Sequence, residues 1–118
     1  MSESTSWLLE LEIRDGQKDN FDSLMKEMIS STQEEPGALD FEWSVSENKK
    51  SCHLFERYAD SSAVMNHLAT FGQKFADRFF AMLKPVRFTV YGAPGDDVKK
   101  ALADFHPAYM DSVGGFSR

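Results

Sequence analysis

Two histidines, an arginine and a tyrosine lie within the stretch "HLFERYADSSAVMNHL", residues 53–68. His53, Arg57 and Tyr58 belong to an alternating, strand-like run, and His67 belongs to the helix-like run that follows it. Imidazole has a pKa of about 6.5, so it can act as a general base or proton shuttle near neutral pH. A guanidinium can stabilise a phenolate or enolate, and a tyrosine hydroxyl can donate to a substrate carbonyl. These four residues are therefore the candidate catalytic residues.

Each of these residues also has an ordinary structural interpretation. A histidine beside an apolar helix face can bond to the backbone or to water, and Arg57 can pair with Asp40 or Glu42. The three histidines, of which the last is His106, show no metal-binding spacing such as His-Glu-x-x-His, so no metal site is expected. Cys52 is the only cysteine, which excludes an internal disulfide and a cysteine-based zinc cluster.

The composition indicates a soluble globular protein. The 118 residues suit a single domain, 1–118, with 42% hydrophobic and 27% charged residues. A net charge of −6 disfavours nucleic acid and anionic membranes as partners, because both attract basic surfaces. The N-terminus "MSESTSW" lacks the layout of a secretory signal, and no apolar run approaches the roughly 20 residues that span a bilayer. We therefore expect a cytoplasmic protein.

Hydrophobic periodicity predicts the secondary structure. Alternation with a period of two predicts four strands, at 7–14, 38–46, 51–59 and 85–92. Helical spacing predicts helices at about 19–33 and 60–83, and Gly72 weakens the middle of the second and can split it. A short amphipathic helix follows "APGDD" in a C-terminal helix and tail, 93–118, beyond a core at about 7–92.

The order β-α-β-β-α-β predicts an α+β fold of the ferredoxin-like, split βαβ type with a four-stranded antiparallel sheet. Two helices can cover only one face of such a sheet, which leaves the other face mixed in polarity. A symmetric "ENKK" loop would place Asp40 opposite Arg57 and Glu42 opposite Phe55 on that uncovered face. The face is then either solvated, with surface ion pairs, or covered by a second subunit.

Three segments resemble the antibiotic biosynthesis monooxygenase family: "EEPGALDFEW", "LFERYADSSAVMNHLATFGQKF" and "PVRFTVYG". The resemblance covers about residues 7–92. Residues 35–37, Glu-Pro-Gly, match the turn that leads into the second strand of the family. Residues 55–58 match its aromatic-rich third strand, and Ala63 and His67 match an alanine and a histidine of its second helix.

The resemblance implies a dimeric α+β barrel, in which two ferredoxin-like protomers pack sheet against sheet as a homodimer. It also implies a small-molecule cavity between the sheet and its helices or inside the barrel. Members of the family include oxygenases that oxidise phenols or quinols with dioxygen and no metal, flavin or haem. Related members degrade haem or isomerise small metabolites, and a shared fold does not fix the chemistry.

The expected function is a cofactor-independent monooxygenase that oxidises a small phenolic, quinol or polyketide-like aromatic. The alternatives are a non-oxidative isomerase on the same scaffold and a dimer that binds a small molecule or haem without turnover. We expect substrate contacts from five residues, Glu42, Phe55, Phe71, Phe75 and Tyr91. The C-terminal extension is expected to pack across a barrel edge or the partner subunit, because several of its apolar residues need cover: Leu102, Phe105, Tyr109 and Phe116.

Overall fold

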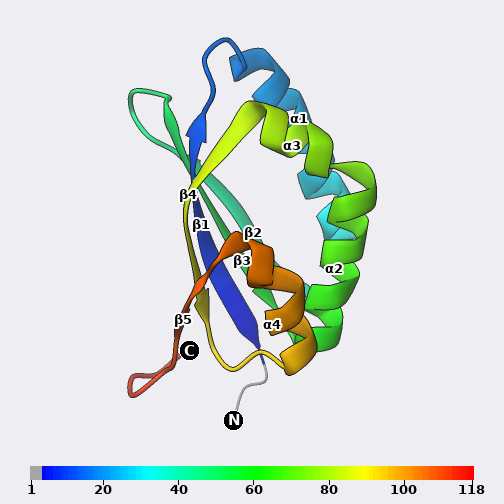
Figure 1. Ribbon diagram of the computed structural model, residues 1–118, viewed down its shortest axis with the longest axis vertical. Coiled ribbons are helices and arrows are strands. Elements are labelled where there is room, and N and C mark those ends of the chain that lie inside the picture. The colour runs from blue at the N-terminus through cyan, green and yellow to red at the C-terminus, as the bar shows by residue number, and fades with distance from the viewer. Residues whose placement is uncertain (1–3) are drawn as a thin grey trace.

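The computed structural model describes residues 4–118, in which one curved sheet carries the helices on a single face (Figure 1). Residues 1–3, the start of the polar N-terminus considered above, lie outside the described part. The strands are β1 (Thr5–Ile13), β2 (Ala38–Val45), β3 (Ser51–Tyr58), β4 (Leu83–Tyr91) and β5 (Ala108–Met110). The helices are α1 (Lys18–Gln33), α2 (Ser61–Lys74), α3 (Ala76–Met82), α4 (Asp96–Leu102) and the 3₁₀ turn η1 (Ala103–Phe105).

The sheet has the order β2-β3-β1-β4-β5, and its first four strands pair antiparallel. This arrangement confirms the α+β, ferredoxin-like class. A fifth strand, β5, was not expected; it pairs parallel with β4 at the sheet edge. Its three residues are exposed and too few to show a period, which is why the sequence pattern did not reveal it.

The pairing of β2 with β3 confirms the register expected from the loop between them. Asp40 lies opposite Arg57 and Glu42 opposite Phe55. Arg57 Nε donates to Asp40 Oδ2 at 2.5 Å, and both side chains are more than a third exposed. This ion pair therefore lies on the sheet face that the helices leave uncovered.

Two local expectations were wrong. The break in the second predicted helix falls at Phe75, which has a φ of −126° and separates α2 from α3, whereas Gly72 lies inside α2. Alternation within the strand predicted at 85–92 would put Val86 on the same core face as Phe88 and Val90, but Val86 is 61% exposed. The β1–β4 register shifts there, with Pro85 opposite Leu11 and Arg87 opposite Glu10, so Val86 is the extra residue of a bulge.

The core lies between the sheet and the helices. One group of buried residues includes Leu11, Leu24, Leu54 and Phe79. A second group, which includes Tyr58 and Leu102, lies toward the end of the sheet that α4 covers: Trp7, Tyr58, Val64, Val90, Val98 and Leu102. Among residues 4–118, no helix combines the length and apolar character required to cross a membrane.

Candidate active site

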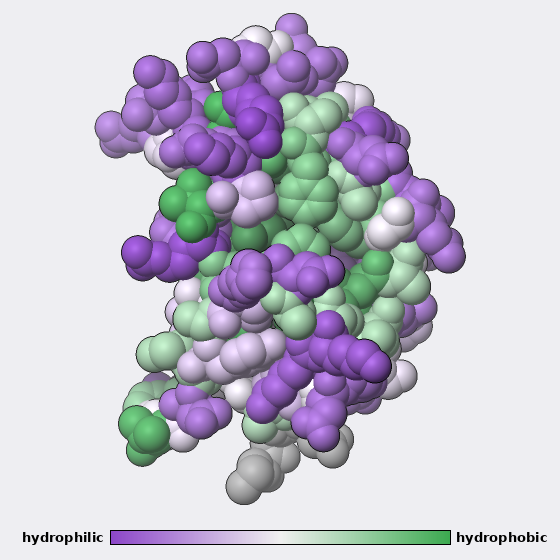
Figure 2. All heavy atoms as spheres, viewed as in Figure 1, coloured by the Kyte–Doolittle hydropathy of each residue, from purple (hydrophilic) through white to green (hydrophobic). Residues whose placement is uncertain are grey.

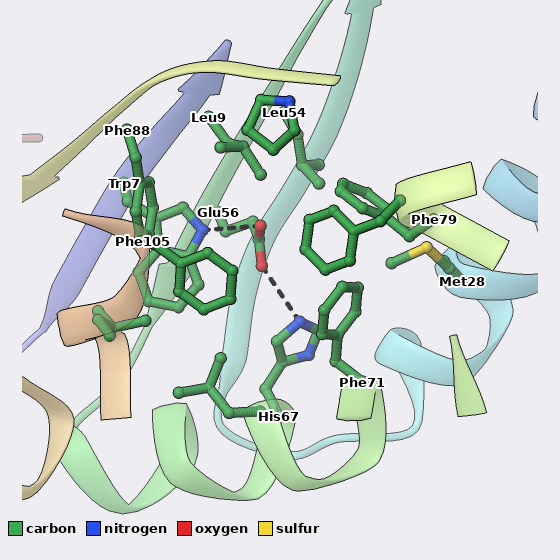
Figure 3. Close-up of a pocket in the computed structure, with 14 residues that line it drawn as sticks. Trp7, Leu9, Met28, Leu54, Glu56, His67, Phe71, Phe79, Phe88 and Phe105 are labelled. Atoms are coloured by element: carbon green, nitrogen blue, oxygen red, sulfur yellow. Dashed lines mark hydrogen bonds and ion pairs between the residues drawn. The ribbon is translucent and has the colours of Figure 1, made fainter. Parts of the chain in front are cut away.

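An apolar pocket lies between the inner face of the sheet and the helices, and η1 contributes to its wall (Figure 3). Aromatic rings form much of that wall: Trp7, Phe71, Phe79, Phe80, Phe88 and Phe105. The cavity has a volume of about 60 Å³, which is enough for several waters or a small ligand group. Figure 2 shows a hydrophobic strip that reaches the surface between the sheet and the helices, with hydrophilic side chains around it.

Glu56 places a carboxylate in this apolar pocket. It follows Cys52 and Leu54 on the inward face of β3, and it is 4% exposed. Trp7 Nε1 donates to Glu56 Oε2 at 2.7 Å, and the Tyr58 hydroxyl donates to Glu56 Oε1 at 2.5 Å. Hydrogen bonds from these two donors stabilise a charged carboxylate that burial alone would disfavour.

His67 lies between two carboxylates. Its Nε2 is 3.2 Å from Glu56 Oε1, and its Nδ1 is 3.1 Å from Glu35 Oε1 and 3.3 Å from Glu35 Oε2. Burial lowers the pKa of His67, but the hydrogen bonds and charges of Glu56 and Glu35 outweigh burial and raise that pKa above its ordinary value. The imidazolium form can donate to both carboxylates at once, so the site favours a protonated His67.

The Tyr58 hydroxyl keeps its proton and donates a hydrogen bond in this site. Tyr58 is fully buried, and burial, followed by the negative charge of Glu56, raises the pKa of its phenol well above the ordinary value. Its ring lies 5.0 Å from that of His67 and 5.2 Å from that of Trp7, measured between centroids. Tyr58 therefore holds Glu56 and His67 in place and does not supply a phenolate.

The turn after α1 brings Glu35 to His67. The backbone N–H of Ala59 donates to the carbonyl of Gly37 at 2.9 Å, which ties this turn to the end of β3. A Cβ on Gly37 would lie 2.4 Å from the Cβ of Ala63, so only glycine allows the turn to approach α2 this closely. Ala63 precedes His67 by one helical turn, so the same contact sets Glu35 beside the imidazole.

The structure divides the nine site residues expected from the sequence between the two faces of the sheet. His67 and Phe71 line the pocket, and Tyr58 bonds to Glu56 at its wall. Phe75 is buried in the neighbouring core group. The remaining five lie on strands with their side chains on the opposite face: His53, Arg57, Glu42, Phe55 and Tyr91.

Sequence reasoning missed Trp7, Glu35 and Glu56 as members of the site. Glu56 offered a signal, because it is a carboxylate in an alternating row that is otherwise inward-facing and apolar. No comparable signal pointed to Glu35, which lies in a turn 32 residues before His67. Within residues 4–118, no three histidine, cysteine or acidic side chains gather in a way that could hold a metal ion.

The fold and the site define an α+β protein of the antibiotic biosynthesis monooxygenase class. The sequence model described as "Antibiotic biosynthesis monooxygenase" matches residues 7–76, more than half of the chain, and the chain belongs to this family. No curated protein sequence matches it closely enough to serve as a relative.

Solved structures share the fold. MupZ from Pseudomonas fluorescens is 24% identical, with a TM-score of 0.88 over 99% of this chain and 96% of that chain. Rv0793 from Mycobacterium tuberculosis is 24% identical, with a TM-score of 0.64 over 79% and 96% of the two chains. SnoaB, a cofactor-independent oxygenase from Streptomyces nogalater, is 14% identical, with a TM-score of 0.67 over 80% and 96%. The MupZ match includes the C-terminal segment of this chain, which lies beyond the family match.

Proposed function

We propose that this protein is a cofactor-independent monooxygenase that oxidises a small, mainly apolar molecule with an acidic hydroxyl, such as a phenol or quinol. The observation that carries the proposal is the buried Glu56–His67 pair at the wall of an aromatic pocket. Among the residues described as lining the pocket, only Trp7, Glu56 and His67 have side-chain nitrogen or oxygen atoms. Membership of the family and the structural likeness to SnoaB, described as a cofactor-independent oxygenase, support the same chemistry.

The pocket offers what such a reaction requires. The substrate ring packs against the aromatic wall with its hydroxyl toward Glu56, which accepts the proton as general base. The electron-rich substrate anion then reacts with dioxygen directly. Conversion of a ring C–H of the phenol into the second carbonyl of a quinone releases four electrons, which reduce dioxygen to one product oxygen and one water, and the protons taken from the substrate end in that water. The imidazolium of His67, 3.2 Å from Glu56, offsets the negative charge that develops beside it.

We also propose that two copies assemble through the sheet face that the helices leave uncovered. In such a homodimer, five of the residues expected at the site would line the shared interior: His53, Arg57, Glu42, Phe55 and Tyr91. Sedimentation equilibrium tests this assembly, because the dimer has twice the 13.4 kDa mass of one chain. A monomer at working concentration would contradict it. A cytoplasmic location remains a prediction from the sequence.

A non-oxidative acid–base enzyme is the second candidate. The specific observation in its favour is that a carboxylate and an imidazole 3.2 Å apart provide a proton acceptor and a proton donor at one place. Abstraction of a proton by Glu56 and its return to another atom of the substrate would constitute an isomerase reaction. This reaction requires no dioxygen, so oxygen dependence separates the two candidates.

Oxygen uptake with a panel of phenols, hydroquinones and enolisable aromatic ketones tests the proposal. We expect uptake matched by product in the wild type and a loss of about 10²-fold or more in Glu56→Gln, the usual size of a general-base effect. Glu27→Gln is the matched control, because Glu27 lies in an exposed ion pair with Arg78. Substrate conversion that proceeds equally without dioxygen would favour the isomerase, and binding without conversion would overturn both.

A further inference from the structure

The pocket, in the form that the structure shows, is too small for the ring of a phenol. Its volume is about 60 Å³, whereas a dry protein cavity that holds benzene has a volume of about 150 Å³. The proposed function, on which this inference rests, requires an aromatic ring inside the pocket. A side chain of the wall must therefore move before such a ligand can enter.

Phe105 is the side chain of the wall that is freest to move. Of the residues described as lining the pocket, only Pro85 and Phe105 are exposed, and Pro85 lies within the paired strand β4. Phe105 is 43% exposed and comes from η1, a three-residue turn with no buried residue. Solvent on one side of its ring leaves room for the ring to rotate outward without displacing another side chain.

The ring of Phe105 bridges the two sides of the pocket mouth. It stacks on Phe80 of α3 with 6.1 Å between centroids and 23° between planes, and it meets Phe88 of β4 edge-on at 6.3 Å. Phe80 and Phe88 are each in edge contact with further rings of the wall, at centroid distances of 5.2 to 5.9 Å. No further ring contact is described for Phe105. Phe80 and Phe88 therefore form a fixed seat, and Phe105 is its removable occupant.

The backbone on both sides of η1 is anchored, so the movement belongs to the side chain. Before η1, Val98 and Leu102 of α4 are buried, and the N–H of Gly95 donates to Ser61 Oγ at 2.9 Å, which ties the start of α4 to α2. After η1, β5 pairs with β4. Rotation of the Phe105 side chain can therefore open the mouth while α4 and β5 stay in place.

We propose that Phe105 is the gate of the pocket: its ring rotates toward solvent when an aromatic ligand binds, and a ring of the ligand takes its place against Phe80 and Phe88. The seat suits such a ring, because it already holds one in both a stacked and an edge-on contact. The two contacts that are lost when the gate opens are replaced by the same contacts with the ligand. Phe105 thus selects ligands whose ring can replace its own.

Binding of 2-naphthol under nitrogen, measured by isothermal titration calorimetry, tests the gate. Phe105→Ala removes the competing ring, so we expect the dissociation constant to fall about tenfold, which corresponds to about 1.4 kcal/mol. Phe105→Trp supplies a larger competing ring and should weaken binding. Phe116→Ala is the matched control, because Phe116 is 79% exposed and does not line the pocket. Equal or weaker binding in Phe105→Ala, or no binding to any of these proteins, would overturn the proposal.

The position of the ring is a second readout that truncates no side chain. 4-Fluorophenylalanine incorporated in place of Phe105 reports on the ring by ¹⁹F NMR, and the same label in place of Phe116 gives the signal of an exposed ring. We expect saturating 2-naphthol to move the first signal toward the second, which should itself stay in place. If the first signal stays unchanged while 2-naphthol binds, the ring remains seated and the proposal is wrong. A protein that opens in this way but consumes no oxygen with any phenol would contradict only the oxygenase proposal.

Discussion

Replacing His67 with glutamine isolates the contribution of the buried imidazolium to stability. His67 lies between Glu35 and Glu56 at 3.1 and 3.2 Å and is 5% exposed. Glutamine has a similar volume and keeps an amide N–H for one carboxylate, but it carries no charge. Loss of one partner from a buried ion pair costs about 3–5 kcal/mol, and we expect about 3 kcal/mol because one hydrogen bond remains.

The stability difference between wild type and His67→Gln should depend on pH. Although burial acts to lower the pKa of His67, the hydrogen bonds and charges of Glu56 and Glu35 raise it overall in the folded protein. A raised folded-state pKa stabilises the protein fully below the unfolded pKa of about 6.5. That stabilisation is lost as the pH rises through the folded-state pKa. The difference should therefore be largest below about pH 6.5 and shrink as the pH rises above that value and through the raised folded-state pKa.

Urea unfolding monitored by tryptophan fluorescence measures this difference. With an m-value of about 2 kcal/mol/M, a loss of about 3 kcal/mol lowers the midpoint by about 1.5 M. Arg78→Gln, which removes one partner of the exposed Arg78–Glu27 pair, is the control and should leave the midpoint nearly unchanged. Equal midpoints for wild type and His67→Gln near pH 6, or a difference that stays constant as the pH rises, would refute the reasoning.

Three further predictions concern the surroundings of the site. Trp7→Phe should lower the free energy of unfolding in urea by about 2 kcal/mol more than Trp43→Phe does. The reason is that Trp7 donates to a buried carboxylate, whereas the Trp43 indole nitrogen has no described partner. Equal losses in the two variants would count against the hydrogen bond of Trp7. Gly37→Ala should destabilise the protein by about 1–3 kcal/mol, and Ala63→Gly in the same chain should recover part of that loss. If the stability changes of the two single variants simply add in the double variant, the two residues do not clash. Burial raises the pKa of the Cys52 thiol to about 12, so a thiol reagent should modify it only on unfolding, and rapid labelling of native protein would contradict its burial.

Periodicity was sufficient to predict the arrangement of β3 and its neighbours. Alternation along the strand predicted at 51–59 puts Cys52, Leu54 and Tyr58 on one face, and all three are buried in the structure. Where a local irregularity interrupts the period, the prediction failed. The bulge at Val86 shifts the register of β4 by one residue, and the three residues of β5 are held by pairing with a distant strand rather than by a pattern of their own.

The site was harder to predict because its contacts join segments far apart in the chain. The same alternation that buries Tyr58 also buries Glu56, yet the partner that stabilises its carboxylate, Trp7, is 49 residues away. The contact between Glu35 and His67 depends on the close approach of Gly37 to α2, which follows from tertiary packing. One sequence can show that a charged side chain faces inward, but the partner that meets it there comes from the assembled fold.

The pocket takes its parts from two separate stretches of the chain. The three side chains of the buried hydrogen-bonded group, Glu35, Glu56 and His67, lie within residues 7–76, the portion that the family model matches. Leu102 and Phe105, which complete the wall, come from the segment after β4. Substitutions in this later segment can therefore reshape the volume offered to a ligand without altering these three side chains. Chimaeras that exchange only α4 and η1 between relatives would be a direct way to change ligand preference while the reaction chemistry stays the same.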